Sequence, residues 1–280
     1  MRKLLRADFA RLETDKVFWF TIAVMVLLIV LAALSTHRTS IELGIEPKSD
    51  GFFTGPFLFV GVALSVFCPT FIGTEYDTGT LRNKLVVGHR RSTVYMANFA
   101  VSAATGLLMS LANLLSACAL CIPLLGVPQM PLGWLCIMIL IGLLSTLALA
   151  ALLAALSMLV SSRTASALVA VLAVASLLLF SGQLYGKLEE PEFIPSYEMT
   201  RTDESGPSAS IQKMVPNPYY LRPAQREHLR LFLDALPTGQ MVQTFLQDAP
   251  NPVRMMLCSL VVMLVSSAAG MFFFDRKEFK

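Results

Sequence analysis

Charged residues are scarce in this sequence. Only 15% of its 280 residues are Asp, Glu, Lys or Arg, whereas 55% are hydrophobic, and a soluble domain carries about 25% charged residues. Long stretches carry no charge, and about 20 apolar residues in a helix cross a bilayer core about 30 Å thick. These stretches exclude a soluble protein with a large core. They predict an all-α polytopic membrane protein with six transmembrane helices, at 17–36, 52–73, 93–125, 134–160, 164–185 and 253–274.

The central parts of the six predicted spans contain no Asp, Glu, Lys, Arg or His. Proton-coupled carriers need such a group, because a buried carboxylate or imidazole takes up and releases the proton. A sodium site can be built from carbonyl and hydroxyl oxygens. The missing ionisable residues therefore argue against a sodium-coupled carrier less strongly and do not exclude it. Most polar residues in the spans are Ser and Thr, which serve helix packing. Asn113, in the middle of the third span, is the polar residue that we single out for mutation.

Motifs for nucleotide binding and catalysis are also missing. The chain has no GxxxxGK[ST] phosphate loop, no HExxH and no GxSxG, and its three histidines fall in separate loops. It also lacks a run of Lys and Arg dense enough to suggest nucleic acid. We therefore predict no enzymatic activity, no bound cofactor or metal, and no nucleic-acid partner. If the chain transports a substrate, another protein must supply the energy.

The basic residues predict an orientation. Lys and Arg concentrate in the short segments 1–16, 74–92, 161–163 and 275–280, whereas the short loops on the other side hold only Arg38 and Lys48. The positive-inside rule then places both termini in the cytoplasm. The predicted organisation is a cytoplasmic interfacial helix at 1–16, five spans over 17–185 with a cytoplasmic loop at 74–92, an extracellular segment at 186–252, and a last span with a cytoplasmic tail over 253–280.

The first sixteen residues have the pattern of a basic amphipathic helix. Leu5, Phe9 and Leu12 fall on one face, while Arg6 and Arg11 lie mostly around the other. Such a helix lies flat in the membrane interface and is attracted to anionic lipid. We expect it to act as an anchor on the membrane surface.

The loop between the second and third spans predicts a short helix. Asp77 or Thr78 can cap its start, Leu81 and Leu85 give it an apolar edge, and Gly88 can end it in a left-handed turn. A capped helix with mixed charge and an apolar edge is suited to docking into a groove on another protein. The alternative is an ordinary solvated loop whose basic residues only set the topology.

The predicted extracellular segment divides in two. Residues 186–223 are rich in Pro, Ser and charge with little periodicity, whereas residues 224–248 have a helical pattern interrupted at 237–239. The segment contains no cysteine and therefore no disulfide framework. We expect a small helical hairpin over the outer mouth of the bundle, or a surface cap with no role in substrate binding. Its apolar faces are Leu229, Phe232, Leu233 and Leu236, then Met241, Val242, Phe245 and Leu246.

These motifs resemble one family. The pattern Glu75-x-x-x-Gly79-Thr80-Leu81-Arg82-Asn83-Lys84, followed by Gly88 and Arg91, resembles the loop after the second span in ABC-2 type transporter permeases. The layout of an interfacial helix, six spans and a polar segment before the last span is similar to theirs. Leu236-Pro237-Thr238-Gly239-Gln240 also resembles a short motif of bacterial permeases in this group.

The resemblance implies specific partners. Members of the family pair two permeases, identical or different, with two separate ATP-binding subunits, which hold the ATP and Mg. The loop after the second span would seat on the ATPase, a role that carries over to Glu75, Gly79, Thr80, Leu81, Arg82, Lys84, Gly88 and Arg91. The turn with Ser162 and Arg163, between the fourth and fifth spans, would make a second, smaller contact.

We therefore expect the permease subunit of an ATP-driven exporter in a bacterial cell membrane. The uncharged path through the spans suits a hydrophobic or amphipathic substrate such as a peptide, lipid or drug. Within the family, the long outer segment favours the branch linked to antimicrobial peptides. The alternatives are a non-transporting sensor, immunity or assembly protein whose outer segment binds a ligand, and an ion-coupled secondary carrier.

Overall fold

A computed structural model describes residues 2–199 and 210–277. Met1, the end of the predicted tail at 278–280 and residues 200–209 lie outside the described residues. The chain begins with α1 (Arg2–Glu13), α2 (Lys16–Leu43), α3 (Gly51–Thr54), α4 (Pro56–Asp77), α5 (Thr80–Val86) and α6 (Arg91–Ser116). A π-helical turn η1 (Ala117–Cys121) leads to α7 (Ile122–Leu125), α8 (Leu132–Leu159) and α9 (Arg163–Glu189). The remaining elements are β1 (Phe193–Met199), β2 (Ser210–Pro216), α10 (Pro223–Ala235), α11 (Pro237–Phe245) and α12 (Pro252–Arg276).

The predicted six-span, mainly helical fold is confirmed. The helices long and apolar enough to cross a membrane are α2, α3 with α4, α6 through α7, α8, α9 and α12. Several extend beyond the predicted apolar stretch because capping residues, not hydropathy, end a helix. In α2, the Asp15 side chain accepts a hydrogen bond from the Phe18 amide at 3.0 Å, and Gly44 ends the helix in a left-handed conformation with φ +64°.

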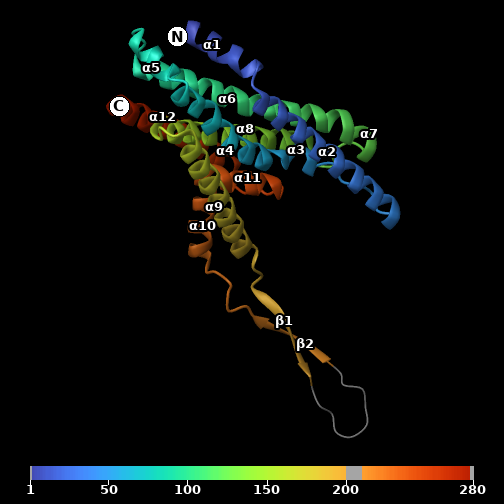
Figure 1. Cartoon of the computed structure of the whole chain (residues 1–280). Coiled ribbons are helices and arrows are strands. Elements are labelled where there is room, and N and C mark those ends of the chain that lie inside the picture. Colours follow the sequence, from blue (N-terminus) through green and yellow to red (C-terminus); the bar gives the residue numbers. More distant parts are fainter. Residues whose placement is uncertain (1, 200–209, 278–280) are drawn as a thin grey trace.

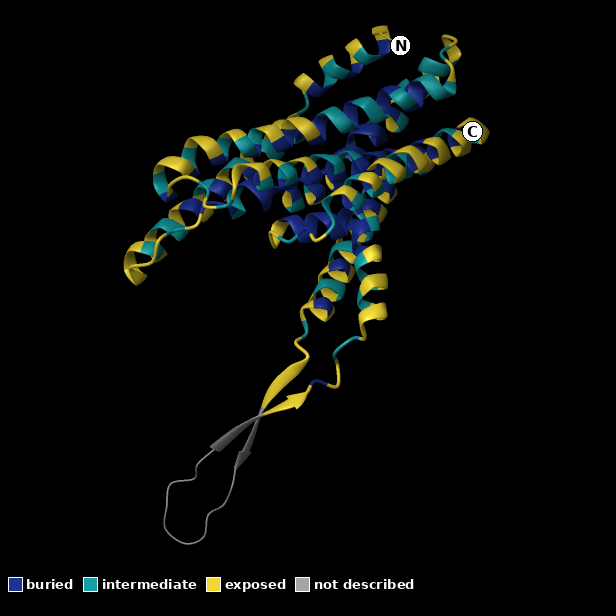
Figure 2. Ribbon diagram, turned by 180° about the vertical axis from the view of Figure 1, so that it is seen from behind, coloured by how far each residue is buried: buried dark blue, intermediate teal, exposed yellow. Residues whose placement is uncertain are grey.

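The bundle is built around α8, which contacts α4, α6 and α12 (Figure 1). Small residues permit this close packing. A Cβ on Gly142 would lie 2.3 Å from the Phe57 ring, and one on Gly270 would lie 2.3 Å from the Tyr95 hydroxyl. The helices α2 and α9 are much more exposed than α4 and α8 (Figure 2). Both termini and α5 lie at the same end of the bundle (Figure 1), which we call the basic end.

The segment before the last span differs from the prediction in two respects. Residues 193–216 include an antiparallel β-hairpin, in which Phe193 pairs with Pro216, and the hairpin projects away from the bundle (Figure 1). The second helix, α11, does not lie over the mouth: its residues 237–244 are all buried, and it packs against α4, α8 and α9. The expected helical hairpin is therefore wrong in its placement.

The buried face of α11 is also more polar than predicted. Thr238, Gln240, Gln243 and Thr244 are buried, whereas Phe245 exposes 45% of its surface. In α10, Leu233 is buried but Phe232 is 63% exposed. The prediction assumed that apolar faces turn inward, as they do in water. In a membrane protein, apolar side chains can face lipid while polar side chains hydrogen-bond inside the bundle.

Candidate functional site

Glu75 occupies the centre of a charged site at the basic end. It lies in the last turn of α4 and is fully buried. Its Oε1 accepts hydrogen bonds from the Lys84 Nζ at 2.6 Å and the Arg11 Nη1 at 2.9 Å, and its Oε2 accepts one from the Asn98 Nδ2 at 3.3 Å. A buried carboxylate is tolerated only when it is paired and hydrogen-bonded in this way.

The site extends to a second carboxylate on α1. Lys84 Nζ also donates to Asp8 Oδ1 at 2.8 Å. The Arg11 guanidinium lies 3.6 Å from the centre of the Phe71 ring and donates to the Phe71 carbonyl oxygen at 3.3 Å. We call Asp8, Arg11, Glu75, Lys84 and Asn98 the buried charge cluster. It joins α1, α4, α5 and α6, and its two cations balance its two carboxylates.

Asp8 is one of three cluster members, with Arg11 and Asn98, that keep a buried polar atom without a hydrogen-bond partner among the described residues. Its Oδ2 is buried and has no hydrogen-bond partner among the described residues. Burial raises the pKa of the Asp8 carboxyl, although the hydrogen bond and charge of Lys84 oppose this shift. The ionised form of Asp8 is thus held in place by Lys84 rather than by solvent.

Two glycines shape the connection around α5. Gly79, with φ +68°, precedes the first residue of α5, and Gly88, with φ +98°, follows its end. Both conformations favour glycine because it has no Cβ. The predicted left-handed turn at Gly88 is confirmed, but the predicted cap is wrong. Asp77 and Thr78 lie at the end of α4, and the Thr78 hydroxyl bonds to Thr74 and Thr80 instead.

The predicted apolar edge of α5 faces the bundle. Leu81 is 1% exposed and Leu85 is partly buried against the core, so neither forms a surface for a partner. The exposed residues are instead Arg82, Asn83, Val86 and Val87, and we call Arg82, Val86 and Val87 the α5 tip. Val86 and Val87 expose 78% and 79% of their surfaces. The signal in the sequence was two adjacent valines directly before a helix-ending glycine.

The other residues of the predicted docking segment divide by exposure. Gly88 is exposed, Gly79, Thr80 and Lys84 are half-buried, and Glu75 is buried. Arg91 does not lie at the α5 tip: its Nη1 donates to the carbonyl oxygens of Phe274, Asp275 and Lys277, at the end of α12. The structure thus makes Glu75 and Leu81 internal residues, which cannot themselves touch a partner.

The predicted second contact lies beside the end of α4. Ser162 and Arg163 are exposed, and the Ser162 hydroxyl caps α9 by accepting from the Ala165 amide at 3.4 Å. A Cβ on Gly73 would lie 2.8 Å from the Arg163 Cα, so only glycine allows α4 and α9 to approach so closely. Gly73 is two residues from Glu75. The fold therefore links this turn directly to the helix that carries the cluster.

The α1 helix packs on the protein with the face that was predicted to enter lipid. Leu12 is buried, Leu5 and Phe9 are partly buried against the core, and Arg11 points to Glu75, while Arg6 remains exposed. Sequence reasoning missed Asp8, which lies between Leu4 and Leu12 at helical spacing. The available signal in the sequence was a carboxylate on the same helix face as two leucines. It also missed Asn98, which it treated as part of the third span.

A second polar cluster lies at the other end of α12. Asp234 of α10 is fully buried and accepts from the Arg254 Nε at 2.6 Å, and Arg254 also pairs with Glu227 at 2.6 Å. Gln240 of α11 donates to the carbonyl oxygens of Asp234 and Met255 and accepts from the Ser259 hydroxyl, each at 2.7 Å. These bonds explain the Leu236–Gln240 motif: its Gln240 joins α10, α11 and α12.

These observations define a polytopic helical membrane protein whose described ion-pair network at the basic end joins a short exposed helix to the spans. The family model described as "ABC-2 family transporter protein" matches residues 4–182, which include the whole buried charge cluster. The chain belongs to this family, as the sequence motifs indicated. It is a multi-pass membrane component of a transporter. No curated protein matches its sequence.

Proposed function

We propose that the chain is the permease subunit of an ATP-driven exporter, with ATP bound and hydrolysed by a separate subunit. The observation that carries this proposal is the buried charge cluster. Ion pairs of the largely buried Lys84 attach the short helix α5, with its exposed tip, to α1 and α4, and the hydrogen bond from Asn98 to Glu75 adds α6. A partner that moves the α5 tip would therefore move spanning helices with it.

These contacts support a path of coupling from α5 through α4 to α9. Lys84 connects α5 to Glu75 near the end of α4, and Gly73 connects α4 to the start of α9. An ATPase that binds the outward-open arrangement more tightly when it holds ATP would shift the population toward that arrangement. The basic end would face the cytoplasm of a bacterial cell, and two permease copies, identical or different, would assemble with two ATPase subunits.

The proposed substrate is hydrophobic or amphipathic. The spans α2, α6, α8 and α9 carry no charged residue in their central parts, and burying a charge there would be costly. The length of the segment before the last span favours a peptide, such as an antimicrobial peptide, within this class. The exposed face of α1, with Arg6, would rest on anionic lipid.

The projecting β-hairpin favours a second candidate function. It extends away from the bundle together with α10 and the end of α9 (Figure 1) and offers a binding arm to a ligand or partner. A sensor or immunity protein would use such an arm without transport. Recruitment of an ATPase distinguishes the two functions.

The test replaces residues of the α5 tip. We expect Arg82→Glu combined with Val87→Asp to abolish recruitment of the ATP-binding subunit, because it reverses one exposed charge and places another on the exposed apolar surface. Leu81→Asp is unsuitable, since Leu81 is buried and its replacement would unfold the bundle. The measurement is the amount of ATP-binding subunit that co-purifies with the tagged chain, together with its ATP hydrolysis in vesicles.

A matched control is available at the opposite end of the bundle. Val127 exposes 72% of its surface in the turn between α7 and α8. The variant Val127→Asp introduces the same charge as Val87→Asp at similar exposure and should recruit the ATPase normally. Full recruitment by the α5-tip variant would contradict the proposal.

A further inference from the structure

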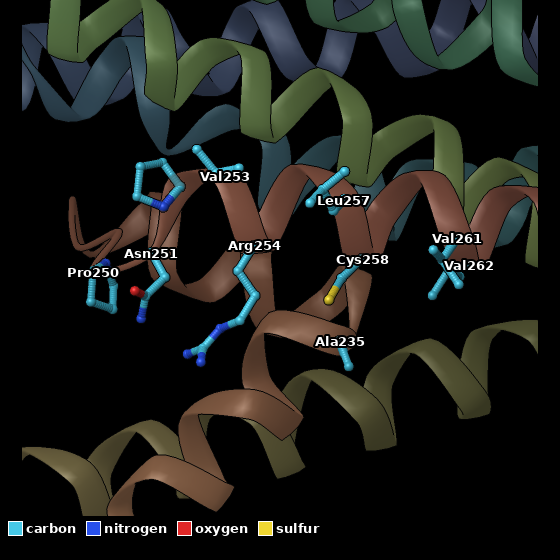
Figure 3. Close-up of a pocket in the computed structure, with 10 residues that line it drawn as sticks. Ala235, Pro250, Asn251, Val253, Arg254, Leu257, Cys258, Val261 and Val262 are labelled. Carbon is cyan, nitrogen blue, oxygen red and sulfur yellow. The ribbon is translucent and has the colours of Figure 1, made fainter.

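Two hollows on the membrane-spanning part differ in character. An open groove of about 610 Å³ runs along α12 beside Ala235, with Arg254, Leu257 and Val261 along its side (Figure 3). Its one charged side chain, Arg254, is already held by Asp234 and Glu227. The second hollow is a cavity of about 440 Å³ between α2, α3, α4, α6 and the end of α11. This volume lies within the range of small-molecule sites.

The cavity is apolar apart from Asn113. Among the described residues that line it, Asn113 has the only polar side chain, and none is ionisable. Asn113 is 3% exposed, and its Nδ2 donates to the Met109 carbonyl oxygen at 2.9 Å and approaches the Met25 sulfur at 3.6 Å. No hydrogen bond from a described residue reaches its Oδ1. The cavity therefore presents one acceptor in an otherwise apolar space.

The rim of the cavity is apolar and partly exposed. Leu28 of α2, Phe59 of α4 and Phe245 of α11 line it, and they expose 46%, 48% and 45% of their surfaces. Phe245 packs over Gly55, where a Cβ would lie 3.3 Å from its ring. The helix α11 thus supplies one wall. With the six helices spanning a membrane, this exposed apolar rim would face lipid, and a molecule dissolved in the bilayer would reach Asn113 without crossing water.

We propose that this cavity binds an uncharged amphiphile with a long apolar body and one hydrogen-bond donor, such as a hydroxyl group. A charged ligand would lose its solvation without gaining a partner. An acyl chain of a membrane phospholipid fits the apolar walls but has no donor for the Asn113 Oδ1. That the bound molecule is cargo rests on the proposed exporter function, whereas the binding itself does not.

The test uses photoreactive probes on the chain alone, in phosphatidylcholine vesicles. One probe is a long-chain primary alcohol with a diazirine in its alkyl chain, the second is the methyl ether of that alcohol, and the third is phosphatidylcholine with the same diazirine in an acyl chain. Adducts are located by mass spectrometry. We expect the alcohol to label the cavity lining about fivefold more than the ether, as one hydrogen bond would give.

Two variants test the Asn113 hydrogen-bond acceptor and the volume of the cavity separately. Asn113→Leu should reduce labelling by the alcohol to the level of the ether and leave labelling by the ether unchanged. Ala32→Phe fills the cavity and should abolish labelling by both probes. The control Ala23→Phe adds the same ring to an exposed position of α2 outside the cavity lining and should label normally. Elution as a single peak in size exclusion confirms that each variant is folded.

Equal labelling by phosphatidylcholine and the alcohol would overturn the inference, because the cavity would then be a lipid-filled gap. Labelling that survives Ala32→Phe would also overturn it. The site and the exporter are tested separately, because no ATPase is present in this experiment. Cavity labelling by the alcohol supports the site even if the α5-tip variant recruits the ATPase and the exporter proposal fails.

Discussion

At the scale of single residues, the fully buried Glu75 carboxylate determines the character of the basic end. It accepts from Arg11, Lys84 and Asn98, which come from three other helices. Removing one partner of a buried ion pair is far more costly than removing a surface pair, because a charge is left in a medium that solvates it poorly. Loss of the Glu75 carboxylate would also affect Asp8, because Lys84 donates to both carboxylates.

We expect Glu75→Gln to destabilise the bundle by about 3–5 kcal/mol, because Arg11 and Lys84 would keep their charges without this carboxylate. The matched control is Glu227→Gln. Glu227 is 61% exposed and pairs with Arg254, and the change should cost far less than Glu75→Gln because exposed ion pairs contribute little. Unfolding of both variants in mixed detergent micelles measures the difference. Equal losses would show that the cluster does not support the fold.

At the scale of elements, α10 and α11 meet at a contact that only glycine permits. A Cβ on Gly239 would lie 2.3 Å from the Leu233 carbonyl oxygen and 3.0 Å from its carbonyl carbon. Both atoms belong to the backbone, so neither can move away alone. Gly239 therefore sets the distance between the two helices and allows Gln240 to bond the Asp234 and Met255 carbonyl oxygens.

The variant Gly239→Ala should destabilise the chain by about 1–3 kcal/mol through overpacking. Gly182 provides the control, because a Cβ on this residue of α9 meets nothing within 4 Å. Gly182→Ala should be neutral or slightly stabilising, since alanine favours a helix. The melting temperatures of the two purified variants are compared. A loss of the same size in Gly182→Ala would show that the effect does not come from the α10–α11 contact.

At the scale of the whole molecule, one helix connects the two sites. Glu75 lies near one end of α4, and Pro56 and Phe59, which line the cavity, lie near the other. A shift of α4 at the basic end would therefore change the walls of the cavity. The buried helix α11 also contacts α4, so a movement of α4 would be transmitted to the segment before the last span.

The proposed orientation predicts which end reacts with impermeant reagents. Val87 and Val127 are similarly exposed, at 79% and 72%, on opposite ends of the bundle. In a chain whose five cysteines are replaced by alanine, Val127→Cys should react with a membrane-impermeant maleimide in intact cells. Val87→Cys should react only after permeabilisation. The reverse pattern would place the basic end outside and remove the α5 tip from reach of a cytoplasmic ATPase.

Local patterns were sufficient for much of this fold. The six spans were predicted because apolar length is a property of a short stretch of chain, and the turn at Gly88 because glycine favours a left-handed conformation there. Family motifs led to the loop that holds Glu75 and Lys84. The side of each helix that faces the protein was predicted less well: Leu81, Leu12 and Arg11 all point inward.

The sequence by itself determined that the chain is a six-span helical membrane protein without a nucleotide-binding motif, because hydropathy and motif spacing are written along the chain. Only the tertiary structure decided that Glu75 is an internal anchor, that Val86 and Val87 belong to the exposed α5 tip, and that α11 packs inside the bundle. These facts depend on which distant segments meet. In a membrane, moreover, an apolar residue gains little by turning inward, so hydrophobicity alone does not select the buried face.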